Sequence, residues 1–174
     1  MKDSYGMMLA TAYRITCDLP ASQEVADKVC KQMSEQNSSD YEQLLGRTCK
    51  LSYVFLIKRK LRLIFGIESD TFEVKQTDSL DEDDYQVKMA LELYCRASEK
   101  MSFMQRIIYS LYVLDDLPSC VAARIAGVSE TRVFEASEQA ENEIKAELRV
   151  FDREGDYKRY LDFIRKVTWP QVHS

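Results

Sequence analysis

Few residues of this chain have the types and spacing that catalysis requires. The single histidine, His173, stands next to the last residue, and neither a Gly-x-Ser-x-Gly motif nor a phosphate-binding glycine loop occurs. The five cysteines are widely spread, and no Cys-x-x-Cys pair indicates a zinc site or a disulfide framework. We therefore expect no enzymatic activity, no cofactor, no metal and a reducing, cytoplasmic location.

Basic side chains are the first candidates for binding chemistry, because Lys and Arg neutralise nucleic-acid phosphates. Between positions 47 and 62 the chain has six Lys or Arg residues and no acidic residue. The candidate nucleic-acid contacts are Lys58, Arg59, Lys60 and Arg62. On a helix, Lys58 and Arg62 lie four residues apart and share a face. The alternative is a short positive helix end that complements the helix dipole.

The second candidate is the segment 119–133, whose spacing is typical of a helix-turn-helix. The positions that fit the motif are Ala123, Gly127, Val128, Ser129 and Val133. A small residue at 123 lets two helices cross closely, and glycine at 127 suits a turn with positive φ. The two valines fill the space between the helices, and Ser129 can cap the second helix. A helix hairpin without a nucleic-acid role is the alternative interpretation.

The elements that position these residues are predicted to be helices. Only five glycines and three prolines interrupt a chain that is 45% hydrophobic, which favours an all-α fold with a buried core. Helical periodicity covers 7–17, 24–33, 41–65, 85–98 and 103–114, and the helix over 41–65 is expected to be mostly buried because it is dense in apolar and aromatic residues. Leu19-Pro20 separates the first two helices, and Ser22 and Asp40 are plausible N-caps. A β-strand is an alternative for 53–57, because a short apolar run does not settle its own period.

The charge distribution divides the chain into parts. Residues 68–84 contain eight acidic residues and one lysine, a composition typical of a solvated linker. We therefore predict two small helical domains joined by that linker, followed by a C-terminal helix. The predicted boundaries are 1–66, 67–84, 85–148 and 149–174. The C-terminal helix is expected to pack on its own domain through Tyr160, Phe163, Ile164 and Val167, and to end near Trp169-Pro170.

Residues 101–148 resemble the fourth region of bacterial sigma factors, especially the extracytoplasmic-function group. Met101–Leu114 aligns with the family helix that is rich in proline, arginine and glutamine, and Gln105-Arg106 matches its polar pair. The residues that match farther on are Leu117, Ala123, Ile125, Gly127, Val128, Ser129, Thr131 and Val133. Upstream, 12–18, 24–28 and 41–62 resemble parts of the family's second region.

The resemblance implies a bacterial transcription initiation protein that binds core RNA polymerase and promoter DNA, with an anti-sigma factor as a further candidate partner. The implied polymerase contacts are Glu24, Val25, Asp27 and Lys28. The implied contacts to the upstream promoter element are Ser129, Thr131 and Arg132. The resemblance also implies that Lys58, Arg59, Lys60 and Arg62 hold the downstream strand. No membrane partner is expected, because no apolar run is long enough to span a bilayer.

The second helix of the motif has an unusual charge for a DNA-reading helix. From Ser129 to Leu148 it carries six glutamates against Arg132 and Lys145. Each glutamate that faced a phosphate would repel it. The alternative function is therefore a sigma-mimicking interaction protein, a decoy or polymerase regulator that does not read DNA.

Overall fold

The computed structural model describes residues 2–36, 40–65, 82–150 and 157–168. All regular structure in these ranges is helical, which is the predicted all-α class. The elements are α1 (Lys2–Thr16), α2 (Leu19–Gln36), α3 (Tyr41–Ile64), α4 (Glu82–Lys100), α5 (Phe103–Ile108), the π-helical η1 (Tyr109–Leu114), α6 (Ser119–Ala126), α7 (Glu130–Val150) and α8 (Tyr157–Thr168). No helix in the described ranges is long and apolar enough to cross a membrane.

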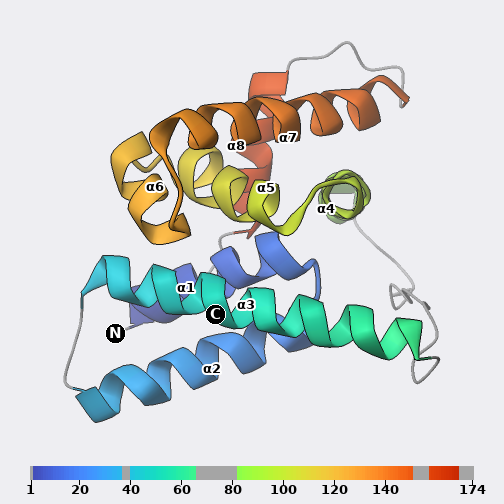
Figure 1. Cartoon of the computed structure of the whole chain (residues 1–174). Helices are drawn as coiled ribbons and strands as arrows, with labels where there is room; N and C mark the ends of the chain where they lie inside the picture. The colour runs from blue at the N-terminus through green and yellow to red at the C-terminus, as the bar shows by residue number, and fades with distance from the viewer. Residues whose placement is uncertain (1, 37–39, 66–81, 151–156, 169–174) are drawn as a thin grey trace.

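The helices are arranged in two halves that lie against each other (Figure 1). In the N-terminal half, α1 packs on both α2 and α3, and in the C-terminal half α7 packs on α4, α5 and α6. Between the halves, α3 contacts α6, and α1 contacts α5, η1 and α8. The N-terminal half therefore rests directly on the helix-turn-helix segment.

A shared hydrophobic core explains this arrangement. One cluster of buried side chains contains Met8 and Ile15 of α1, Leu45 of α3, Leu111 of η1 and Val133 of α7. Burial of such apolar side chains is worth about 1.5–3 kcal/mol each, so contacts of this kind favour the packed halves. The division into two domains stays a prediction, and the described parts of the two halves share this core.

The start of α2 differs from the prediction that placed Ser22 at its N-cap. The helix begins at Leu19, and the backbone N–H of Ala21 donates to Asp18 Oδ1 at 2.9 Å. Asp18 therefore takes the capping role, and Pro20 is tolerated because the first helical turn needs few N–H donors. Ser22 is buried inside the helix, where its hydroxyl donates to the Asp18 carbonyl at 2.5 Å.

The helix α3 is continuous through 53–57, so the strand alternative for that segment is wrong. Asp40 caps it as predicted, because its side chain accepts a hydrogen bond from the Glu42 N–H at 3.1 Å. The expectation that the helix is mostly buried fails at its end, where Leu61, Ile64 and Phe65 are 46%, 66% and 73% exposed. The buried residues of α3 lie between Leu44 and Leu56, so periodicity alone overestimated the burial of this helix.

Several predicted boundaries move in the structure. The helix α4 already begins at Glu82, inside the predicted linker, and α7 continues to Val150. The remainder of the linker and Trp169-Pro170 lie outside the described residues. The helix α8 packs on the C-terminal half as predicted, because Ile164 is fully buried and the Tyr160 hydroxyl donates to the Ala90 carbonyl at 3.2 Å.

Candidate functional site

The turn between α6 and α7 is built around one glycine. Gly127 has φ 70° and ψ 36°, the left-handed conformation that the sequence predicts for this position. The backbone N–H groups of Gly127 and Val128 both donate to the Ala123 carbonyl. Ala123 and Val133 are buried in the shared core on either side of the turn. The short α6 and the longer α7 therefore meet at this turn, and the chain does not continue as one helix.

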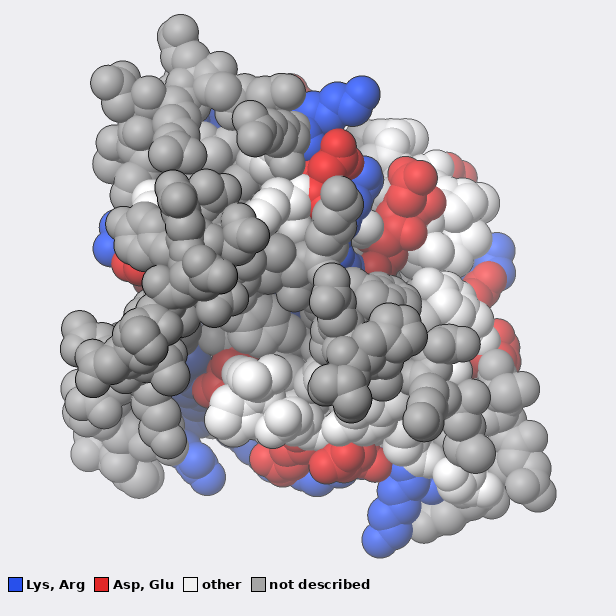
Figure 2. Space-filling view, turned by 180° about the vertical axis from the view of Figure 1, so that it is seen from behind, with Lys and Arg blue, Asp and Glu red and all other residues white. Residues whose placement is uncertain are grey.

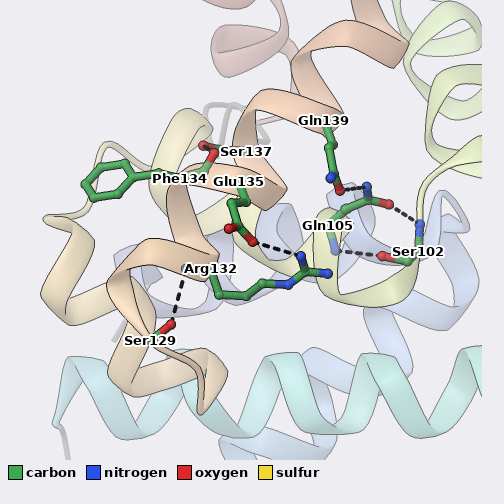
Figure 3. A network of polar contacts seen from close by, with 8 residues as sticks. All are labelled: Ser102, Gln105, Ser129, Arg132, Phe134, Glu135, Ser137 and Gln139. Carbon is green, nitrogen blue, oxygen red and sulfur yellow. Dashed lines mark hydrogen bonds and ion pairs between the residues drawn. The ribbon is translucent and has the colours of Figure 1, made fainter.

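The first turn of α7 brings three of the predicted DNA contacts together. Ser129 Oγ accepts a hydrogen bond from the Arg132 N–H at 3.3 Å, which caps the helix (Figure 3). Ser129, Thr131 and Arg132 are all exposed. Glu130 is exposed beside them and accepts a hydrogen bond from the Ser119 hydroxyl at 2.5 Å. The first turn of α7 therefore exposes four polar side chains to solvent.

The exposed face that follows this turn is acidic. The guanidinium of Arg132 forms an ion pair with Glu135 at 3.1 Å, and both side chains are about half exposed (Figure 3). Glu138 is exposed on the next turn. Gln139 accepts a hydrogen bond at 2.8 Å from Gln105 of α5, whose own position is set by a capping box with Ser102. The outer face of α7 therefore offers one arginine among several glutamates.

The basic run of α3 is divided between two sides of the helix. The hydrogen bond from Lys28 lowers the pKa of the Glu24 carboxyl on α2, and Lys58 and Arg62 add to that shift. These two cations therefore point toward α2, on the shared face that their spacing predicts. Arg59 and Lys60 instead line a cleft of about 550 Å³ between α3 and the turn from α4 to α5. The four predicted contacts do not form one continuous basic surface.

Charges of both signs are mixed elsewhere on the surface. Figure 2 shows, on the side opposite to Figure 1, Lys and Arg lying beside Asp and Glu over the described part of that face. Several ion pairs of the described residues lie within one helix, including Lys145 with Glu141 at 2.5 Å and Arg96 with Glu92 at 2.8 Å. No broad basic patch for nucleic acid is visible on the described part of this side.

The predicted polymerase contacts lie on α2. Glu24, Asp27 and Lys28 are exposed, with Lys28 paired to Glu24 at 2.5 Å and Asp27 accepting a hydrogen bond from the Tyr5 hydroxyl at 3.0 Å. Val25 is only 4% exposed and belongs to the core. A partner that docks on α2 would therefore meet the three charged side chains and not Val25.

Two ion pairs join the halves beside the motif. Arg14 of α1 pairs with Asp115, which follows η1, and both side chains are buried. Burial raises the pKa of the Asp115 carboxyl, and Arg14 opposes that shift. Arg124 of α6 forms two hydrogen bonds to the Glu42 carboxylate of α3, at 2.8 and 3.0 Å, in a more exposed setting. Sequence spacing could not indicate either pair, because the partners are distant along the chain.

Comparison with known proteins does not assign this chain to a family. No protein-family model, curated protein or solved structure matches the chain. Among the residues that the structure describes, no three His, Cys, Asp or Glu side chains gather as metal ligands would.

Proposed function

We propose that this chain is a sigma-factor-like transcription initiation protein, which binds core RNA polymerase and promoter DNA in the bacterial cytoplasm. The observation that supports this proposal most is the turn at Gly127, which leaves the first turn of α7 exposed while Val133 is held in the core. A helix held in this way can place its N-terminal residues in a major groove.

Arg132 is the residue that reads the upstream promoter element in this proposal. It must exchange its ion pair with Glu135 for a contact to a base edge. An exposed ion pair is worth about 0–1 kcal/mol, whereas a bidentate arginine–guanine contact contributes about 1–3 kcal/mol of discrimination. The exchange is therefore favourable at a site that contains guanine. Ser129 and Thr131 stand beside Arg132 as hydroxyl donors to bases or phosphates.

The N-terminal half supplies the remaining contacts. Lys58 and Arg62, and on the cleft side Arg59 and Lys60, hold the backbone of the downstream strand by neutralising phosphates. The exposed charges of α2 at Glu24, Asp27 and Lys28 form the polymerase contact. An anti-sigma factor that covered α2 or the first turn of α7 would block these functions.

A second candidate function rests on the acidity of α7. Glu130, Glu135 and Glu138 are exposed around Arg132, and Phe134 on the same helix is 50% exposed beside Tyr112. Carboxylates near a DNA backbone oppose binding, whereas an acidic face with one exposed aromatic suits a basic protein surface. The alternative is thus a sigma-mimicking interaction protein, for example a decoy for an anti-sigma factor.

The test is promoter selection with bacterial core RNA polymerase. A random-sequence duplex library is incubated with core polymerase and the full chain, and retained duplexes are sequenced and used as transcription templates. Under the first proposal one upstream sequence is enriched, and Arg132→Glu lowers transcription from it at least about tenfold while polymerase binding persists. The matched control is Arg96→Glu, which reverses another exposed arginine in an intrahelical ion pair and leaves transcription unchanged.

The same experiment separates the two candidates. Enrichment of no sequence, and no duplex binding at any salt concentration from 50 to about 200 mM, would contradict promoter recognition. Retained polymerase or anti-sigma binding under those conditions would support the interaction protein instead.

A further inference from the structure

Two cysteines from different halves of the molecule lie against each other. Cys17 follows α1, Cys95 lies in α4, and their thiols are joined by a hydrogen bond. Both residues are buried, with exposed fractions of 6% and 5%. The hydroxyl oxygen of Tyr13 lies 4.0 Å from Cys95 Sγ, within hydrogen-bonding distance of that sulfur. Neither the motif nor the proposed DNA and polymerase contacts use these two thiols.

The backbone at Cys17 is unusual for a residue with a side chain. Its φ is 53°, in the left-handed region that favours glycine, while its N–H donates to the Tyr13 carbonyl at 2.7 Å. Backbone conformations of this kind concentrate at functional positions, where surrounding contacts hold them. The conformation turns the Cys17 thiol toward Cys95 at the point where α1 ends.

The electrostatic setting makes the two thiols unequal. The hydrogen bond from Cys95 lowers the pKa of the Cys17 thiol, and the Arg106 guanidinium acts in the same direction against the effect of burial. The same contact raises the pKa of Cys95. Cys49 provides the contrast, because burial raises the pKa of its thiol to about 12. Of the two thiols, Cys17 is therefore the one that ionises more readily, and Cys95 is the one that holds its proton more firmly.

An oxidant can approach this pair from one side. Cys17 lines the cleft of about 550 Å³ between α3 and the turn from α4 to α5, together with Arg59, Lys60 and Arg106. A neutral hydroperoxide is small enough for this space, and Arg106 stabilises the negative charge on the reacting sulfur. Cys95 is hydrogen-bonded to Cys17 and is not among the residues that line the cleft, so it is placed to resolve an oxidised Cys17 sulfur.

We propose that Cys17 and Cys95 form a redox-active thiol pair that a hydroperoxide converts to a disulfide. The Cys17 thiolate attacks one peroxide oxygen, the O–O bond breaks, and Cys17 sulfenic acid forms with release of hydroxide. Cys95 sulfur then attacks Cys17 sulfur, the S–OH bond breaks, and the Cys95 proton leaves with that hydroxyl as water. The released hydroxide takes up the proton that Cys17 lost on ionisation, so the two thiols lose two electrons and hydrogen peroxide is reduced to two water molecules.

The disulfide would link the end of α1 to α4 and fasten the two halves in their packed arrangement. Any effect on transcription rests on the proposed function, whereas the thiol chemistry does not. Loss of DNA binding would therefore leave this inference intact, and absence of the disulfide would leave the proposed function intact.

The experiment treats the reduced full chain with one equivalent of hydrogen peroxide at pH 7 and maps its peptides without reduction. We expect one product, in which the peptides of Cys17 and Cys95 are cross-linked and the other three cysteines stay reduced. In Cys95→Ser, we expect Cys17 to stop at the sulfenic acid, which dimedone traps. Cys120→Ser, which removes an exposed thiol, is the matched control and keeps the cross-link.

Two results would overturn the inference. One is oxidation of exposed Cys120 while Cys17 and Cys95 remain reduced, and the other is a mixture of disulfides without preference for this pair. The peptide map of the unmodified sequence decides between these outcomes even where a serine variant does not fold.

Discussion

The helices α3 and α7 are the two long charged helices of the proposed function, and they differ in how charge and geometry are combined. The second half of α3 carries four cations between positions 58 and 62, and the helix itself is continuous from Tyr41 to Ile64. The first turn of α7 follows the turn at Gly127 and is exposed, but it places Arg132 among glutamates, one of them its ion-pair partner Glu135. Under the proposed function, α3 therefore has the charge that nucleic acid requires, and α7 has the exposed position after a helix-turn-helix turn.

This difference indicates that the geometry of the turn and the charge of the exposed surface have separate causes in this chain. The turn before α7 depends on Ala123, Gly127 and Val133, all of which act through backbone conformation or burial. Glu135 and Glu138 are exposed beyond the first turn of α7, so their charges can change without changing the turn, whereas Glu130 accepts a hydrogen bond from Ser119 of α6. Under the proposed function, α3 supplies most of the phosphate affinity and α7 supplies orientation and base discrimination.

The largest expected effect concerns the buried ion pair that joins α1 in the half containing α3 to the end of η1 in the half containing α7. Asp115→Asn leaves the buried Arg14 cation without its countercharge, and such a loss costs about 3–5 kcal/mol. Urea unfolding followed by circular dichroism should show that decrease in the free energy of unfolding. The double variant Arg14→Met with Asp115→Leu removes both charges and should recover most of the lost free energy of unfolding. Equal stability of Asp115→Asn and the wild type would contradict a role for this pair in joining the halves.

The next effect tests whether α3 carries the phosphate affinity. Lys58→Gln with Arg62→Gln removes two cations, so the slope of log K against log salt should become about 2 less steep, and affinity at 0.1 M salt should fall on the order of 10–100-fold. Fluorescence anisotropy with a random-sequence duplex measures both quantities. The matched control is Lys31→Gln with Lys158→Gln, which changes the net charge by the same amount at two exposed lysines outside residues 58–62. Equal losses in both double variants would mean that net charge, and not the α3 surface, sets the affinity.

A smaller effect is expected at the turn that gives α7 its orientation. Gly127→Ala forces an L side chain into φ 70°, which costs about 1–2 kcal/mol. Gly46→Ala is the matched control, because an added Cβ meets nothing within 4 Å at either glycine but Gly46 lies inside α3. There the substitution should stabilise by about 0.5–1 kcal/mol. The midpoint temperature of thermal unfolding should therefore fall for Gly127→Ala and rise for Gly46→Ala. A change in the same direction for both variants would argue against a conformational role for Gly127.

The smallest effect concerns the acidic neighbour of Arg132. Glu135→Gln frees the guanidinium and removes one negative charge, so promoter affinity should rise about two- to fivefold, in line with the 0.4–1 kcal/mol of an exposed pair. Glu141→Gln makes the same change at a glutamate paired with Lys145 two turns farther along α7. A rise with Glu141→Gln alone would place the DNA contact away from the first turn.

Much of the local structure could be predicted because its causes lie within a few residues. The turn at Gly127, the cap at Asp40 and the shared face of Lys58 and Arg62 all follow from spacing on a helix. The cap of α2 was misplaced because Asp18 and Ser22 both suit an N-cap, and only the observed start at Leu19 separates them. The exposure of Ile64 was missed because periodicity identifies an apolar face without showing what covers it.

By itself, the sequence determined that the described chain is helical and that a turn with positive φ separates α6 from α7, since both depend on backbone preferences and nearby side chains. Only the tertiary structure decided that Arg14 meets Asp115, that Cys17 meets Cys95, and that α3 packs on α6. Those contacts join residues far apart in the chain, and their energy depends on burial and mutual orientation. No local sequence pattern specifies the burial or the mutual orientation of these residues, because both arise only when the two halves pack together.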